Sequence, residues 1–151
     1  MSDFELTRPG IALRSGADLQ ALRKASAEKF MAIAERHKPE GYTFEYRKSL
    51  SGMHYGKSKL IKAPRPVTRK ALYIFLHECA HAHLGHAHNG NFPRHVEEMQ
   101  AEKWAHEKMR EAGVSVHRSM TTRAKAYVAR KIRPAGTRAR IAPEARRYAR
   151  P

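Results

Sequence analysis

Apolar positions in the first third of the chain recur at helical spacing. The positions that share one face are Leu19, Leu22, Ser26, Phe30 and Ile33. Each lies three or four residues from the next, which is the spacing of a single helix face. Side chains that can cap a helix precede this run at residues 15–18, and Gly41 follows it. The pattern predicts an amphipathic helix over residues 18–37.

The hydrophobic period changes from helical to alternating after Gly41. Residues 42–47 alternate in polarity, and two shorter segments at 54–56 and 59–62 follow, with glycines marking turns between them. Two prolines at 64 and 66 then end the extended region. We therefore expect two or three short antiparallel strands between residues 42 and 64.

Two strong helical segments come next. Thr68 can cap the first, which runs over residues 68–84 until Gly85, and the second covers residues 94–112. A third stretch, over residues 120–132, places its apolar residues on one side. No fold is expected beyond Pro134. The elements together predict an α+β protein with an N-terminal helix, a small antiparallel sheet, two helices and a basic helical C-terminal tail.

The first of these two helices ends in His77-Glu78-Cys79-Ala80-His81, an HExxH motif. Positions i and i+4 share a helix face, so both imidazoles can reach one metal ion. Glu78 lies about 100° further round, where it can act on a water molecule at that ion. The motif predicts two zinc ligands, His77 and His81, and a catalytic base, Glu78.

A catalytic zinc site needs a third protein ligand and one open position. Glu98 is the preferred candidate because it shares a helix face with Ala101 and Ala105, whose small side chains allow close approach of another helix. Glu102, one turn later, is expected to hold the outer ring nitrogen of a ligating histidine. His88, Glu97 and Glu102 remain alternative third ligands, and the other histidines are expected to face solvent or to form a weak secondary metal patch.

The motif pair resembles the glutamate-zincin (gluzincin) metallopeptidases, and the small size and preceding strands are similar to the ImmA/IrrE-type members. The residues that carry the resemblance are His77, Glu78, His81, Glu98, Ala101, Glu102, Trp104 and Ala105. The resemblance implies a small zincin-like domain that hydrolyses peptide bonds, often in a regulator. Gln100 departs from the pattern, which commonly has glutamate there. Residues 88–92 resemble, more weakly, the SprT-like metalloproteases.

These features predict a zinc-dependent metallopeptidase that acts on an intracellular protein or peptide. Zinc would activate water, and Glu78 would accept the proton and deliver it to the leaving amine. The strand at residues 60–61 would offer its edge to an extended substrate. Candidates for an additional oxyanion donor are His54, Tyr55, His106, His117 and Tyr127.

The net charge of +16 is concentrated in the last quarter of the chain. Residues 114–151 contain eleven Lys and Arg and one acidic residue, so we divide the chain into a metallopeptidase domain, 1–113, and a basic extension, 114–151. The extension could bind nucleic acid through its phosphates. The residues predicted for this role are Arg123, Lys125, Arg130, Lys131 and Arg133. A nucleic-acid-binding protein with a structural or vestigial zinc site is therefore the alternative function.

The single cysteine, Cys79, excludes an internal disulfide bond and a cysteine-based zinc cluster. Its place inside the motif predicts a small core residue. The first residues lack the features of a secretion signal, and no apolar stretch is long enough to cross a bilayer. We expect a cytoplasmic protein with no membrane partner.

Overall fold

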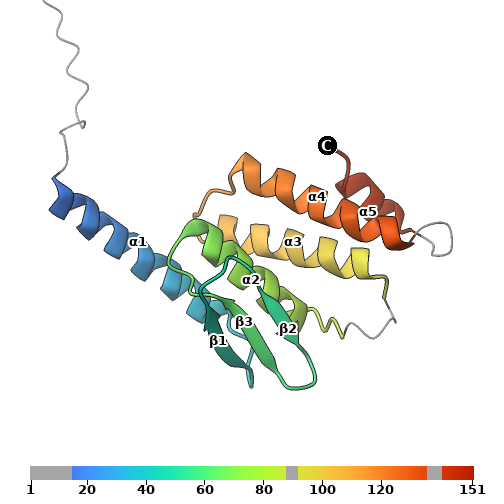
Figure 1. The fold of residues 1–151 in the computed structure, drawn as a ribbon, viewed down its shortest axis with the longest axis horizontal. Helices are drawn as coiled ribbons and strands as arrows, with labels where there is room; N and C mark the ends of the chain where they lie inside the picture. The colour runs from blue at the N-terminus through green and yellow to red at the C-terminus, as the bar shows by residue number, and fades with distance from the viewer. Residues whose placement is uncertain (1–14, 88–91, 136–140) are drawn as a thin grey trace, which may run out of the picture.

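The computed structural model describes residues 15–87, 92–135 and 141–151, with side chains up to Ile132 in the second range. It is an α+β structure with an N-terminal helix, a three-stranded sheet and four further helices (Figure 1). The elements are α1 (Gly16–His37), β1 (Thr43–Arg47), β2 (Met53–Tyr55), β3 (Leu60–Pro64), α2 (Arg69–His83), α3 (Arg94–Glu111), α4 (Arg118–Ala135) and α5 (Pro143–Tyr148). The predicted α+β class is confirmed.

The sheet is mixed, so the prediction of a purely antiparallel sheet is wrong. β3 lies in the middle, with β2 antiparallel on one side and β1 parallel on the other. The short connection after β1 carries the chain past β3 to its far side, and β2 then returns as a hairpin partner. β3 is therefore hydrogen-bonded along both edges. The expectation that this strand offers its edge to a substrate is therefore wrong. The edge strand nearest α2 is β2.

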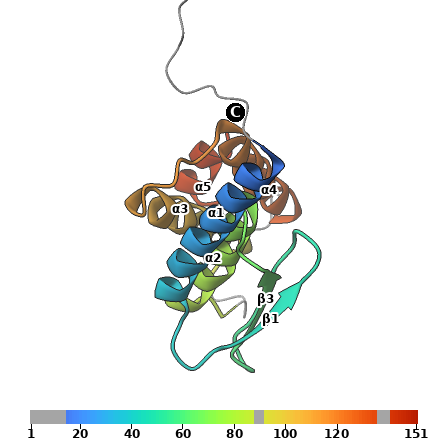
Figure 2. The same ribbon diagram turned by 90° about the vertical axis from the view of Figure 1, so that its left-hand side faces the viewer.

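α2 is the central helix of the molecule, lying between the sheet and α3 (Figures 1 and 2). Every residue from Ala71 to His81 is buried, and Leu72, Phe75 and Leu76 are fully enclosed. Cys79 is also fully buried within this core, as predicted. Helix α3 packs closely on α2, and Ala101 and Ala105 are completely buried on it. The core thus surrounds the polar HExxH residues on the same helix.

Both ends of α2 are defined by local chemistry. Thr68 Oγ1 accepts a hydrogen bond from the backbone N–H of Ala71, which satisfies a donor of the first turn. At the other end Gly85 has φ of +69°, a left-handed conformation that suits glycine. The N–H of His86 bonds to the carbonyl of His81, and that of Gly85 to the carbonyl of Ala82, which together form a Schellman motif. This turn folds His86 back toward the end of α2.

The C-terminal region contains more structure than the sequence predicts. α5 forms beyond Pro134, where no fold was expected, and its Ala145 is buried against Met99 and Val128. A further contact ties α5 to α3, because the N–H of Ala142 donates to His95 Nε2. These long-range contacts stabilise a helix whose own sequence carries no strong periodic signal. α4 packs along α3, and the division of the chain at residue 113 stays a prediction.

Within the described ranges, no helix has the length and apolar character needed to cross a membrane.

Candidate metal centre

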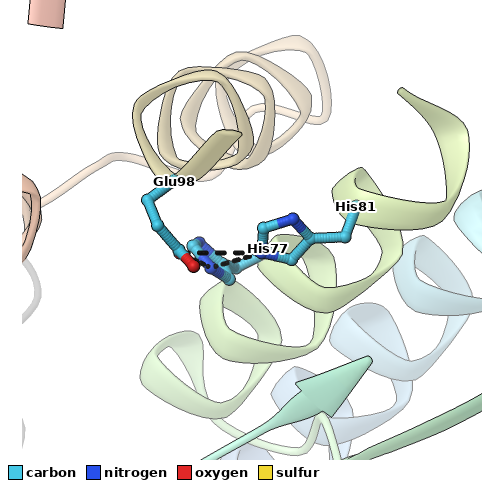
Figure 3. A group of neighbouring side chains, drawn as sticks. All are labelled: His77, His81 and Glu98. Atoms are coloured by element: carbon cyan, nitrogen blue, oxygen red, sulfur yellow. Dashed lines mark hydrogen bonds and ion pairs between the residues drawn. The ribbon is translucent and has the colours of Figure 1, made fainter. Parts of the chain in front are cut away.

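Three side chains from two helices converge at the centre of the molecule. His77 and His81 project from α2 toward Glu98 on α3 (Figure 3). The two Nε2 atoms are 3.2 Å apart, and Glu98 Oε2 lies 3.2 Å from His77 Nε2 and 3.6 Å from His81 Nε2. All three residues are buried. Among the described residues, these form a group whose ligand atoms could hold one metal ion.

The spacing of the three atoms fits a tetrahedral metal site. Nitrogen and oxygen ligands lie about 2.0–2.1 Å from zinc, which separates neighbouring ligands of a tetrahedron by about 3.3 Å. The observed separations of 3.2, 3.2 and 3.6 Å are close to this value. Two imidazoles with one carboxylate also form a donor set that zinc accepts. The residues present therefore fit a divalent metal ion with one position left for another ligand.

Electrostatics within the group favour a charged Glu98. Burial by itself would raise the pKa of Glu98, but its interactions with His77 and His81 outweigh this effect and lower the pKa below the usual range. Its second oxygen, Oε1, lies 3.0 Å from Nε of Arg94, one turn earlier on α3. This ion pair leaves only Oε2 directed at the histidines, which favours binding through one oxygen.

Glu102 lies against the outer ring nitrogen of His77. Its Oε1 is 3.3 Å from His77 Nδ1, a contact with ion-pair distance but without hydrogen-bond geometry. The hydroxyl of Tyr73 donates a hydrogen bond to the other oxygen of Glu102. Burial raises the pKa of Glu102 to about 8. Glu102 therefore lies beside the outer nitrogen of His77, and its role in fixing the tautomer of that ring stays a prediction.

The outer nitrogen of His81 has a partner that the sequence analysis missed. His81 Nδ1 lies 2.9 Å from His86 Nδ1, and His86 Nε2 lies 2.8 Å from Gln100 Oε1. An amide oxygen can only accept, so His86 must donate from Nε2 and accept at Nδ1. His81 then donates from Nδ1, so the neutral ring carries its lone pair on Nε2, directed at the group. Gln100 and His86 thus fix the tautomer in which His81 can bind a metal.

Glu78 is buried beside the group and faces a cavity of about 210 Å³. Burial raises the pKa of Glu78 to about 7, so this carboxyl can exchange a proton near neutral pH. The loop before β2 lies in close contact with Glu78, since a Cβ at Gly52 would be only 2.5 Å from Glu78 Cγ. Gly52 is therefore required here for close approach, and it allows the loop to hold the glutamate in place.

The cavity beside Glu78 is completed by α4. Tyr127 and Arg130 line it together with Arg123, and Gly52 lines it from the loop before β2. The Tyr127 ring lies 6.2 Å from the His77 ring, and Arg130 and Lys131 lie 5.6 and 5.2 Å from the centre of the Tyr127 ring. Burial, together with nearby carboxylates, raises the pKa of Tyr127 to about 12, so its hydroxyl stays a donor. Of the five suggested oxyanion donors, Tyr127 has both a place in the cavity and a proton to donate.

The other suggested donors have different surroundings. The ring of His54, on β2, stacks on that of His81, with ring centres 5.9 Å apart. The hydroxyl of Tyr42 lies 2.9 Å from His54 Nε2. Tyr55, further along β2, contacts Met53, and His106 packs against Tyr73 outside the group. His117 lies away from the cavity, in a groove between α1 and α4.

The expectation that the remaining histidines face solvent is wrong for His86 and His95, whose rings contact Gln100 and the backbone of Ala142. His86, His95 and His106 are buried. Among the alternative third ligands, Glu97 is buried on α3 but is not part of the group, and His88 lies outside the described residues.

Comparisons with known protein families, with curated proteins and with solved structures found no match for this chain. The class of molecule is therefore defined by its own geometry, as an α+β protein with a buried His-His-Glu group suited to a metal ion.

The first prediction concerns the third ligand. Glu98→Ala should lower bound zinc from near one equivalent to a small fraction, because two imidazoles alone form an incomplete site. Elemental analysis of protein purified without added metal measures this, with circular dichroism as a check of folding. Glu97→Ala is the matched control and should retain the metal. Equal zinc in Glu98→Ala and the parent would contradict the assignment.

The second prediction concerns the tautomer of His81. Gln100→Leu should weaken zinc affinity by about 10–100-fold, the usual effect of removing a partner behind a ligand. Gln100→Glu should restore it, because a carboxylate also accepts the proton of His86 Nε2. Chelator competition measures both, and Lys103→Leu, at an exposed position on α3, is the control. Unchanged affinity in Gln100→Leu would show that the interaction has no role.

Proposed function

We propose that this chain is a zinc-dependent metallopeptidase in which His77, His81 and Glu98 hold the metal and Glu78 is the general base. One observation carries the proposal: three buried ligand atoms at tetrahedral spacing lie next to a carboxyl with a pKa near 7 that faces a cavity. A metal site that served only to stabilise the fold would not need a proton-exchanging group beside an open space.

Zinc held by three protein ligands supplies Lewis-acid chemistry that activates water and polarises a carbonyl. The residues of the chain perform the proton transfers. Glu78 accepts a proton from the attacking water and later delivers it to the amine of the leaving peptide. Burial raises the pKa of this carboxyl, which helps it to hold the proton between the two steps, whereas a divalent cation beside it would lower the pKa again.

Tyr127 is the proposed hydrogen-bond donor to the oxyanion. It lines the same cavity as Gly52 and lies beside His77, and its raised pKa keeps the hydroxyl protonated. A fixed donor aimed at developing negative charge stabilises the transition state more than the ground state. Arg123 and Arg130 add positive charge along the same wall.

The substrate is proposed to be an extended peptide that pairs with β2. Two contacts place β2 beside the centre: the His54 ring stacks on His81, and Gly52 abuts Glu78. As an edge strand, β2 can form backbone hydrogen bonds with a further strand. Such pairing would carry a peptide carbonyl across the cavity without requiring a particular side chain.

Nucleic-acid binding by the basic C-terminal residues stays a prediction. Two of the five residues named for it, Arg123 and Arg130, line the cavity beside Glu78, and Lys131 packs on Tyr127. Their positions support a role at the metal centre, so the peptidase is the function that we put forward.

The third prediction tests the base. Glu78→Gln should lower cleavage by about 10²–10⁴-fold, the usual contribution of general acid–base catalysis, while zinc stays bound. Little stability should be lost, because the amide resembles the neutral form of a carboxyl whose pKa is already near 7. The measurement is mass spectrometry of new termini in a peptide library made by digesting a whole proteome.

Glu107→Gln, an exposed glutamate on α3, is the control for that experiment and should cleave like the parent. Equal cleavage by the parent and Glu78→Gln would contradict the assignment of Glu78 as the general base. Absence of cleavage by the zinc-loaded parent across the library would contradict the peptidase itself.

The fourth prediction tests the donor. Tyr127→Phe should lower kcat by about 10²-fold with little change in KM, because the hydroxyl acts on charge that develops only in the transition state. Zinc content should not change. The measurement is steady-state kinetics on the best peptide from the library. A rise in KM with kcat unchanged would assign Tyr127 to substrate binding instead.

A further inference from the structure

A second and larger hollow lies on the side of the molecule where α1 begins. It is a groove of about 1150 Å³ between α1, the start of α2 and the start of α4, and we refer to it as the α1 groove. Its wall on one side is the N-terminal half of α1, which extends beyond the other elements (Figure 1). A capping box formed by Ser15 and Asp18 fixes the first turn of this helix, so the projecting wall is a regular helix.

The apolar residues that line the α1 groove, which we call its floor, are exposed at the N-terminal end of α1. Leu19 and Leu22 are 46% and 43% exposed, although they belong to the same helical stripe as Ile33, which is buried in the core. Phe30 and Met120 continue the floor toward the body of the molecule. The stripe on α1 is therefore covered by the core at its C-terminal end and left open at its N-terminal end. Exposed apolar side chains gathered in one groove are typical of an interaction site.

The rim of the α1 groove is strongly basic. The charged residues that line it are Arg23, Lys24, Arg69, Lys70 and Arg123, and none of the described lining residues is acidic. α2 begins at this rim, and its first turn contains no acidic residue to offset the positive end of the helix dipole. A ligand of this groove should therefore combine apolar side chains for the floor with negative charges for the rim.

The α1 groove adjoins the cavity of the candidate metal centre. Tyr73 and Arg123 line both, so one wall separates the groove from the space that Glu78 faces. The hydroxyl of Tyr73 also donates to Glu102, behind His77. A segment held in the groove would thus lie next to a peptide bound at the centre.

We infer that the α1 groove binds an acidic amphipathic segment of a partner protein. The complementarity of charge and of apolar surface supports the binding, which is independent of any reaction. That the segment belongs to the substrate, and holds it for cleavage, rests on the proposed function. The apolar floor favours a protein segment over nucleic acid, whose phosphates would match the rim but leave the leucines uncovered.

The test uses the full chain carrying Glu78→Gln, which prevents cleavage of the probe. The probe is a fluorescent helical peptide with leucine at positions i, i+3, i+4 and i+7 and glutamate on its other face. Fluorescence anisotropy gives its affinity, and a scrambled peptide of the same composition shows whether the apolar stripe matters. The acidic amphipathic peptide should bind, and the scrambled peptide should bind at least about tenfold more weakly, since it cannot bury its leucines together.

Two variants with matched controls locate the binding. Leu22→Glu should weaken binding by about tenfold or more, whereas Ala25→Glu, an exposed position on α1 outside the groove, should not change it. Lys70→Glu should weaken binding and reduce its dependence on salt, and Lys29→Glu, also outside the groove, is the control. Leu22 and Lys70 are both exposed, so we expect both variants to fold, and weaker binding then reports on the groove itself.

Three results would overturn the inference. Equal binding of the amphipathic and scrambled peptides would show simple charge attraction. If a DNA duplex displaces the peptide, and Leu22→Glu does not weaken binding of that duplex, the groove is a surface for nucleic acid. If the double variant Phe4→Ser, Leu6→Ser binds the peptide more tightly than the parent, the natural occupant of the groove is the chain's own segment Asp3-Phe4-Glu5-Leu6.

The binding assay and the cleavage assay test the docking site and the peptidase independently. Loss of peptide binding with cleavage intact would leave the peptidase without this docking site. Binding in the groove by a protein that cleaves nothing would keep the interaction surface and remove only its role in holding a substrate.

Discussion

The structure depends on a cluster of buried titratable side chains between α2 and α3. Glu78, Glu98 and Glu102 are all nearly enclosed, and they surround two imidazoles at the centre of a small core. Glu98 is the charged member of this cluster, and burying an ion costs several kcal/mol unless cations compensate it, as Arg94 does at one of its oxygens. A divalent metal ion held by His77, His81 and Glu98 would compensate the charge at the other oxygen. The fold therefore makes physical sense as the scaffold of a metal centre.

Distant parts of the chain each contribute one element of this arrangement. The Schellman motif at Gly85 returns His86 to His81, and Gly52 allows the loop before β2 to approach Glu78. α4 adds Tyr127 to the lining of the cavity. The three atoms that could bind a metal come from two adjacent helices, but the groups around them come also from the turn after α2, the loop before β2 and α4. Such support from neighbouring groups is what keeps a site in working geometry.

The sequence predicted the parts that depend on local periodicity. Helices α1 to α4, the HExxH face and the shared face of Glu98, Ala101 and Ala105 follow from spacing alone, and the structure brings His77, His81 and Glu98 together. The i,i+4 spacing of Arg94 and Glu98 was an available signal for their ion pair that the sequence analysis did not use.

The parts that depend on the path of the chain in space were not predictable. The parallel pairing of β1 with β3 requires the chain to cross to the other side of β3, which short connections do not indicate. The contact of His86 with Gln100 requires the left-handed turn at Gly85, and α5 is held by Met99 and Val128 from distant segments. Gln100, which departs from the resembling family, has a clear place here as the acceptor that orients His86.

X-ray absorption at the zinc edge of the zinc-loaded protein tests the central claim most directly, because it reports the atoms that surround the metal. The account predicts one zinc per chain with nitrogen and oxygen ligands at about 2.0–2.1 Å, two of them imidazoles, and no sulfur. A third imidazole, a sulfur ligand from Cys79, or a metal that does not bind stoichiometrically would contradict it.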